Sequence, residues 1–118
     1  MKTKAAPPGE VNLLDLVPVQ NLTWESDETG RVILLKPKIK NAFLARHLLP
    51  RIRKPHYKIR LDEIGSAFWL RCDGQRSIQA IAELQKREFG DAVEPLYERI
   101  SRFLRTLEKN RFIVFKKK

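Results

Sequence analysis

Two short stretches early in the chain have the hydrophobic patterns of β-strands. Residues 21–27 alternate about Leu22 and Trp24, and residues 31–36 are rich in Val, Ile and Leu. Between them, residues 27–30 have the Asp, Thr and Gly composition of a turn. The pattern predicts a β-hairpin whose second strand stops at Pro37, because proline removes a backbone donor.

A four-residue apolar repeat follows the hairpin. Leu44, Leu48 and Ile52 recur within residues 39–52, which is the spacing of one helical face, and Pro50 limits the length of this helix. The repeat predicts a short amphipathic helix.

Alternation returns after that segment. Tyr57, Ile59 and Leu61 alternate with Lys58 and Arg60. This is the pattern of a short strand with one buried and one solvated face. We expect it to be the third strand of a sheet begun by the hairpin.

Helical periodicity dominates from Asp62 onward. Asp62 and Ser77 suit the N-caps of two helices that end at Gly74 and Gly90, and a third helix is expected over residues 93–109. The apolar stripes are Ile64, Ala67, Phe68 and Cys72 in the first helix, Ile78, Ile81, Ala82 and Phe89 in the second, and Leu96, Ile100, Phe103, Leu104 and Leu107 in the third. Residues 112–115 predict a last short strand or an extended tail.

This order of elements predicts an α+β fold of the winged helix-turn-helix kind, with an N-terminal three-stranded β-sheet followed by three α-helices. A chain of 118 residues suffices for one hydrophobic core. We expect residues 1–15 to be a flexible tail and residues 16–118 to form a single domain. Residues 38–56 are then a basic helical insertion between the second and third strands.

The net charge of +10 is unevenly distributed. Between Thr29 and Leu61 there are ten basic residues and no acidic one, whereas from Asp62 to Lys118 twelve basic residues face nine acidic ones. The second half therefore has the mixed surface of an ordinary domain, and the first carries a basic patch that suits an anionic partner.

The residue types that catalysis or metal binding would need are sparse. Cys72 is the one cysteine and lies on a predicted apolar stripe, so we interpret it as a small buried hydrophobe rather than a nucleophile. His47 and His56 lack the spacing of a metal motif. We expect no catalytic residue, no metal and no cofactor. No apolar run is long enough for a signal peptide or a membrane span, so we expect a cytoplasmic protein.

One block carries a family resemblance. Residues 61–69 read LDEIGSAFW and are followed by Cys72-Asp73-Gly74 and by Ser77-Ile78 with Ile81 and Ala82. Together with Trp24 and residues 32–37 upstream, and Phe103, Leu104 and Leu107 downstream, this block resembles the PqqD-like family, over about residues 16–115. The insertion departs from the family pattern, in which a much shorter connection joins these two strands.

The resemblance implies a recognition module that binds the leader of a ribosomally made precursor peptide and presents it to a modifying enzyme, often a radical SAM protein, as in pyrroloquinoline quinone (PQQ) biosynthesis. Binding would proceed by strand addition along the third strand, against one flank of the third helix. Lys58 and Arg60 would favour carboxylates on the peptide. The expected peptide-binding residues are Tyr57, Lys58, Ile59, Arg60, Leu61, Arg99, Arg102 and Thr106, although the flank with Tyr97 and Ser101 is an open alternative.

Other functions compete for the basic segment. A winged helix with a positive patch is also typical of nucleic-acid-binding proteins, but the third helix mixes its arginines with glutamates that would oppose phosphates. The insertion would cover the strand edge, widen the groove, or pair with a second copy of the chain. It could also touch an anionic membrane surface without inserting. Its expected partner or dimer contacts are Phe43, Leu44, Leu48, Arg51 and Ile52.

Overall fold

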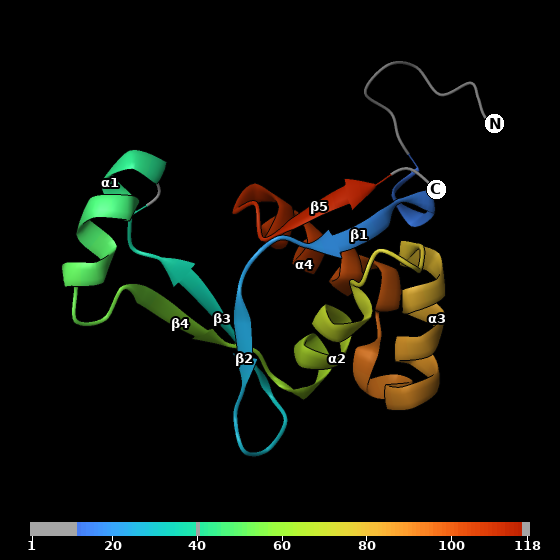
Figure 1. The fold of residues 1–118 in the computed structure, drawn as a ribbon. Coiled ribbons are helices and arrows are strands. Elements are labelled where there is room, and N and C mark those ends of the chain that lie inside the picture. Colours follow the sequence, from blue (N-terminus) through green and yellow to red (C-terminus); the bar gives the residue numbers. More distant parts are fainter. Residues whose placement is uncertain (1–11, 40, 117–118) are drawn as a thin grey trace.

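The computed structural model describes residues 12–39 and 41–116, and these residues form an α+β fold with two small antiparallel sheets (Figure 1). Strands β2 (Trp24–Ser26), β3 (Val32–Pro37) and β4 (His56–Arg60) form one sheet in the order β2-β3-β4. Strand β1 (Val17–Gln20) pairs with β5 (Ile113–Lys116) in the other. The predicted hairpin and third strand are confirmed, and the α+β class with them.

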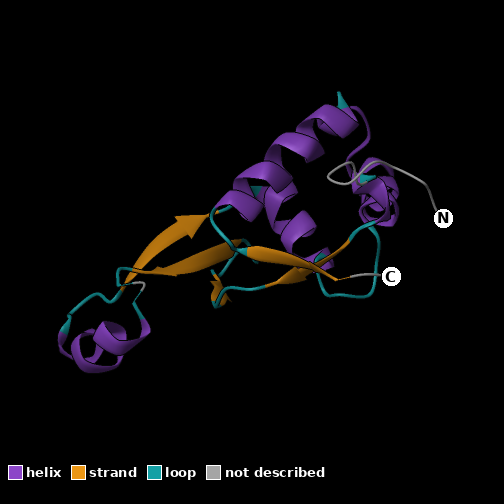
Figure 2. Ribbon diagram, turned by 90° about the horizontal axis from the view of Figure 1, so that it is seen from above, coloured by secondary structure: helices purple, strands orange, loops and turns teal. Residues whose placement is uncertain are grey.

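Helices α2 (Glu63–Arg71), α3 (Ile78–Phe89) and α4 (Leu96–Lys109) pack together on one side of the strands (Figure 2). Their apolar stripes meet the inner face of the three-stranded sheet, where Val32 and Leu34 are fully buried. The sequence patterns placed most of the core correctly but left out Trp69, which is fully buried. The helical part of the core comprises Phe68, Trp69, Cys72, Ile78, Ile81, Ala82, Leu96, Ile100, Leu104 and Leu107.

Capping residues set the helix starts as predicted. The Asp62 carboxylate accepts the Gly65 N–H at 2.7 Å, and the Ser77 hydroxyl accepts the Ala80 N–H at 3.2 Å. The third helix begins later than expected. Residues 90–93 form a short 3-10 helix, η3, and α4 starts only after Pro95, whose fixed φ suits the entry to a helix.

The end of α2 also differs from the prediction. The helix stops at Arg71, and Gly74 lies beyond it with φ +80°, where its N–H donates to the Pro18 carbonyl at 3.0 Å. A side chain at position 74 would be strained at this φ and would crowd Val19, so glycine is required there.

The insertion projects from the body. The outer ends of β3 and β4 carry helix α1 (Ala42–Leu48) and the 3-10 helix η2 (Leu49–Arg51), and we call the described residues of 35–58 the arm (Figures 1 and 2). The predicted amphipathic helix is confirmed in a shorter form. No residue of α1 is buried, so its apolar repeat does not face this domain's core.

Two N-terminal elements were not predicted. Asn12–Asp15 were expected to belong to a flexible tail, but Leu13–Asp15 form the 3-10 helix η1, and Leu13 and Leu14 pack on the core. Strand β1 was also missed. Its pairing with β5 shows that the C-terminal segment is a strand rather than an extended tail. The rest of the expected tail, residues 1–11, lies outside the described residues.

Candidate functional site

Strand β4 is an edge strand. Its hydrogen bonds with β3 show which of its backbone groups point away from the sheet. The Leu61 N–H donates to the Val32 carbonyl of β3 at 2.9 Å, and the Lys38 N–H donates to the Pro55 carbonyl at 3.0 Å. Because strand backbone groups alternate in direction, the odd-numbered residues of β4 bond to β3. The N–H and C=O groups of His56, Lys58 and Arg60 therefore point away from the sheet.

These outward groups form a free ladder, since no other described strand pairs with β4 on that side. The sequence prediction treated the whole of residues 57–61 as the ladder, and this needs correction. The N–H of Ile59 points toward β3 and is used inside the sheet. The backbone groups of Tyr57 and Leu61 also point toward β3.

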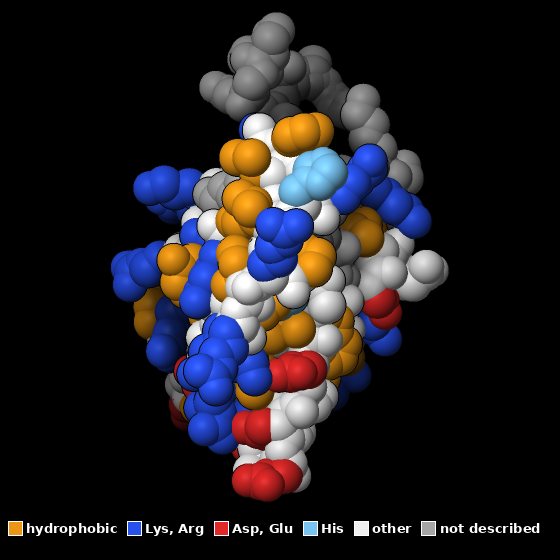
Figure 3. Space-filling view, turned by 60° about the vertical axis from the view of Figure 1, so that its left-hand side comes forward, with side chains coloured by type: hydrophobic (Ala, Val, Ile, Leu, Met, Phe, Trp, Pro, Cys, Tyr) orange, Lys and Arg blue, Asp and Glu red, His pale blue; other side chains and the backbone are white. Residues whose placement is uncertain are grey.

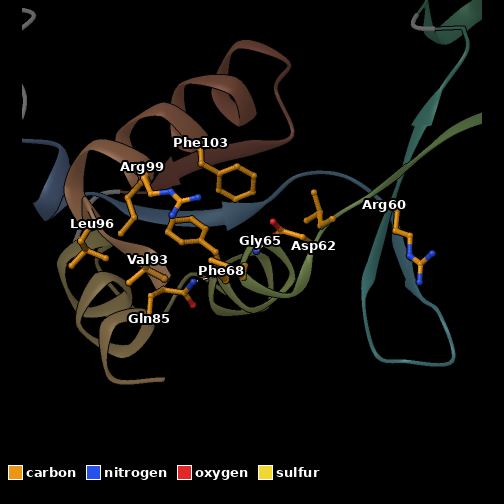
Figure 4. Close-up of a pocket in the computed structure, with 12 residues that line it drawn as sticks. Arg60, Asp62, Gly65, Phe68, Gln85, Val93, Leu96, Arg99 and Phe103 are labelled. Atoms are coloured by element: carbon orange, nitrogen blue, oxygen red, sulfur yellow. Dashed lines mark hydrogen bonds between the residues drawn. The ribbon is translucent and has the colours of Figure 1, made fainter. Parts of the chain in front are cut away.

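A cavity of about 470 Å³ opens beside the end of β4 (Figure 4). Its walls come from the β4–α2 junction, α2, α3, η3 and α4, and most of the lining side chains are apolar. It is lined by Arg60, Leu61, Asp62, Ile64, Gly65, Phe68, Gln85, Val93, Leu96, Arg99, Ile100 and Phe103. An apolar side chain of a ligand would lose its contact with water there.

Two aromatic rings form one wall of the cavity. Phe68 of α2 and Phe103 of α4 meet edge to face, with ring centroids 5.4 Å apart and an interplanar angle of 84°. Gly65 keeps the space in front of Phe103 open, since a Cβ at position 65 would lie 3.7 Å from the Phe103 ring. A side chain larger than glycine would narrow the cavity at this point.

Gln85 closes the cavity from α3 as a buried polar residue. Its amide Nε2 donates to the Ile64 carbonyl at 3.1 Å, and its Oε1 accepts from Arg71 Nη1 at 2.5 Å. Both polar ends of the side chain are therefore satisfied, and Gln85 joins α2 to α3 rather than offering a group to a ligand.

Arg99 lies at the rim of the cavity, on the α4 side. Its Nη1 donates to the Ala92 carbonyl at 2.8 Å, which holds the guanidinium close to η3 while the residue stays exposed. A second, shallower hollow continues along α4 and is lined by Arg99, Arg102, Phe103 and Thr106. The two hollows adjoin each other, because Arg99 and Phe103 line both, and we call them together the groove.

The predicted site residues are therefore partly brought together. Arg60, Leu61 and Arg99 line the cavity, and Arg102 and Thr106 line its extension. Tyr97 and Ser101, on the alternative flank of the last helix, line neither of these two hollows. Sequence reasoning assigned Ile64, Phe68, Leu96 and Phe103 to the core and missed that they border a cavity.

Lys58 and Arg60 are not the unopposed cations that the sequence predicted. Lys58 Nζ lies 3.4 Å from Glu25 Oε1, and Arg60 Nη2 lies 2.5 Å from Asp27 Oδ2, both across the solvated face of the sheet. The hydroxyl of Thr29, backbone N–H groups of the turn and Arg60 lower the pKa of Asp27 to about 2. The acids of β2 and its turn thus neutralise part of the basic strand.

Cys72 is fully buried among the core residues, as predicted. Burial raises the pKa of its thiol to about 12, so the reactive thiolate is absent at neutral pH. Within residues 12–39 and 41–116, no three His, Cys, Asp or Glu side chains gather closely enough to hold a metal ion. No helix of this part of the chain is long and apolar enough to span a bilayer.

The contacts expected on the insertion are at the surface. Phe43, Leu44 and Leu48 are exposed on α1, Arg51 is exposed in η2, and Ile52 is half-buried. They lie on the arm, beyond the His56 end of β4, whereas the cavity lies beyond its Arg60 end.

Fold and site together define a small α+β domain with a free sheet edge beside an apolar groove. In a comparison with protein families, residues 47–113 match the family described as coenzyme PQQ synthesis protein D (PqqD). The match covers more than half of the chain and includes β4 and all the helices that line the cavity. The chain belongs to the PqqD family, which confirms the prediction made from residues 61–82.

Family membership associates the chain with the biosynthesis of PQQ or of related products made from precursor peptides, in which PqqD proteins are non-catalytic accessory proteins. The matched segment begins at His47, so the hairpin and most of α1 lie outside it. Searches among curated proteins and among solved structures gave no further match.

Proposed function

We propose that this protein binds a precursor peptide as an additional strand on the free edge of β4 and holds an apolar side chain of the peptide in the cavity between α2 and α4. The observation that carries this proposal is the continuity of the two features. Arg60 ends the free ladder, and Arg60 and Leu61 are also the first residues of the cavity wall. An extended peptide on β4 would therefore reach the cavity without changing direction.

The two features supply different parts of the binding. The ladder of His56, Lys58 and Arg60 offers backbone hydrogen bonds that are independent of the peptide sequence. The cavity selects an apolar residue at one position, and Arg99 and Arg102 at the groove rim would favour a carboxylate beyond it. Arg102 is already paired with Glu98 at 3.1 Å, so its contribution would be small.

The protein itself would perform no chemistry on the peptide. The groove is lined mainly by apolar side chains and arginines, and Asp62, the carboxylate on its wall, is occupied as a helix cap. We propose that the bound peptide is presented to a separate modifying enzyme, such as a radical SAM protein. The domain would follow the winged helix-turn-helix plan, with α3 and α4 used for packing and peptide binding rather than for DNA.

Selection from a random peptide library displayed on phage tests the proposal and does not require the natural peptide. Wild-type protein should enrich peptides that share one apolar position, and these should shift the amide resonances of residues 56–60 and of the cavity wall. The exposed face of α3, residues 78–89, should be unaffected. Failure to enrich any peptide, or shifts confined to α3, would contradict strand addition at β4.

A further inference from the structure

The arm carries apolar side chains that this domain does not cover. On α1, Phe43 is 69% exposed, Leu44 45% and Leu48 41%. The Phe43 and His47 rings contact each other in a tilted arrangement, with centroids 4.7 Å apart and an interplanar angle of 60°. Exposed apolar groups gathered on a projecting element are typical of a surface that another molecule covers.

The same arm is strongly basic. The sequence has no acidic residue between Thr29 and Asp62, and the described basic residues of the arm are Lys36, Lys38, Arg46, Arg51, Arg53, Lys54 and Lys58. Figure 3 views the molecule toward the arm and shows the apolar side chains ringed by basic ones, with the acidic side chains gathered at the lower end. The field around the arm therefore attracts anionic surfaces.

A hollow of about 610 Å³ lies where the arm joins the sheet. Basic residues dominate its rim, and Lys38 also packs over the Tyr57 ring at 5.3 Å. Its lining is Glu25, Leu35, Lys38, Arg53, Lys54, Pro55, His56, Tyr57 and Lys58. A hollow of this size accepts side chains that project from a partner.

The apolar side chains, the basic residues and the hollow of the arm together favour one class of binding partner. A symmetric dimer formed through the arms would bring two equally basic arms together, and like charges repel. Nucleic acid would leave Phe43, Leu44 and Leu48 without an apolar contact. A bilayer surface would cover the apolar residues of α1 but would not reach into a hollow formed by the sheet and the loop residues before β4. A protein surface offers both an apolar depression and projecting acidic side chains.

We infer that the arm is a docking element for another protein whose surface combines acidic side chains with an apolar depression that receives Phe43 and its neighbours on α1. Docking would be driven by burial of the α1 side chains and steered by the basic residues. The hollow of the arm shares His56 and Lys58 with the peptide ladder, whereas α1 and the cavity lie beyond opposite ends of β4. A partner held by α1 therefore leaves the cavity open to a peptide.

Photocrosslinking in the cells that naturally produce the protein identifies the partner. A benzophenone amino acid replaces Phe43 in the full-length chain, and the same group at exposed Arg87 on α3 is the control. The protein crosslinked specifically at position 43 is then purified, and its affinity for the wild type and for variants is measured by calorimetry. The arm variants are Phe43→Ser with Leu48→Ser, and Arg51→Glu with Arg53→Glu.

Both double variants should weaken binding by about tenfold or more, because they remove the apolar anchors or reverse the charge. All four positions are exposed, so the fold should be retained. Leu70→Ser, at a residue 45% exposed on α2, and Arg87→Glu are matched controls and should leave the affinity unchanged. Peptide binding at β4 should also be unchanged in the arm variants.

Other results would overturn the inference. These are a crosslink at position 43 to lipid, to nucleic acid or to a second copy of the chain, no crosslink above that at position 87, or an affinity that is the same in the arm variants as in the controls. Binding of the arm to phosphatidylserine vesicles with the same sensitivity to these substitutions would assign it to a membrane. None of these results affects the peptide site, which the phage selection tests separately.

Discussion

The hydrogen bond of 2.9 Å from the Leu61 N–H to the Val32 carbonyl determines which backbone groups of β4 remain free. Pairing at Leu61 requires that Ile59 and Tyr57 also bond to β3, and it directs the amide of Lys58 toward solvent. Proline substitutions at single positions can therefore distinguish the free edge of β4 from the edge that is paired with β3.

Lys58→Pro should remove an outward donor and abolish or strongly weaken peptide binding, while the fold is retained, because proline is tolerated where the N–H faces solvent. Ser26→Pro is the matched control. Ser26 lies on the opposite edge of the same sheet, and the bond from the Leu35 N–H to the Thr23 carbonyl indicates that its N–H also faces outward. Isothermal titration with a selected peptide measures the difference.

Lys58→Ala separates the backbone effect from loss of the side chain. The ion pair with Glu25 is exposed, so its removal should change binding or stability by at most ~1 kcal/mol. Equal losses of affinity in Lys58→Pro and Lys58→Ala would show that the ladder is not used. Ile59→Pro should instead destabilise the protein, because it breaks a bond between β3 and β4.

Phe103→Ala should reduce peptide affinity by about tenfold or more, as expected for loss of an aromatic anchor in a binding pocket. Tyr97→Ala is the control, since Tyr97 is a 50% exposed aromatic residue of the same helix that lines neither hollow. Fluorescence anisotropy with a labelled peptide would detect the difference. Similar affinities in the two variants would rule out the cavity as the site of the apolar side chain.

Ser66→Ala should lower the free energy of unfolding by ~1–3 kcal/mol, because it leaves a buried donor without a partner. The Ser66 hydroxyl accepts the N–H of Val32 at 2.8 Å, and both residues are buried. This bond joins α2 to β3. Urea denaturation provides the measurement, and Ser101→Ala, at a half-buried position on α4, should have a much smaller effect.

Acid should remove a contribution of Asp27 to stability. The pKa of this carboxyl is lowered from 3.8 to about 2 in the folded protein, so its stabilising interactions are complete above pH 4 and are lost as the pH falls toward 2. In Asp27→Asn the loss of stability between pH 4 and 2 should be smaller than in the wild type. Glu28→Gln, in the same turn, serves as the control in acid denaturation followed by circular dichroism.

Local sequence patterns identified most elements, because amphipathic periodicity, caps and turn residues act over short distances. Strand β1 was missed since it contains Pro18 and its partner lies at the other end of the chain. The cavity was missed for a different reason. An apolar stripe shows that Leu96 and Phe103 face inward, but whether the opposing helix fills the space depends on residues such as Gly65 in another element.

The direction of the β4 ladder was equally inaccessible to sequence reasoning. Alternation of Tyr57, Ile59 and Leu61 with Lys58 and Arg60 predicts which side chains are buried. It does not reveal on which side of the strand its partner lies, and this decides whether the odd or the even amides are free. The acidic residues that pair with Lys58 and Arg60 come from β2 and the turn after it. The absence of acidic residues from 30 to 61 therefore made this strand look more positively charged than it is.

The pairing of β1 with β5 has a topological consequence. Val17 lies opposite Lys116, so the first and last strands of the described fold enter and leave the domain side by side, on the side away from the arm (Figure 1). A Gly/Ser bridge could join the end of β5 to the start of η1, so that Leu13 and Leu14 stay on the core, and the chain could be reopened in the exposed β2–β3 turn near Gly30. Such a circular permutant would keep both the groove and the arm, and its new termini would lie where a fused enzyme or reporter can be attached.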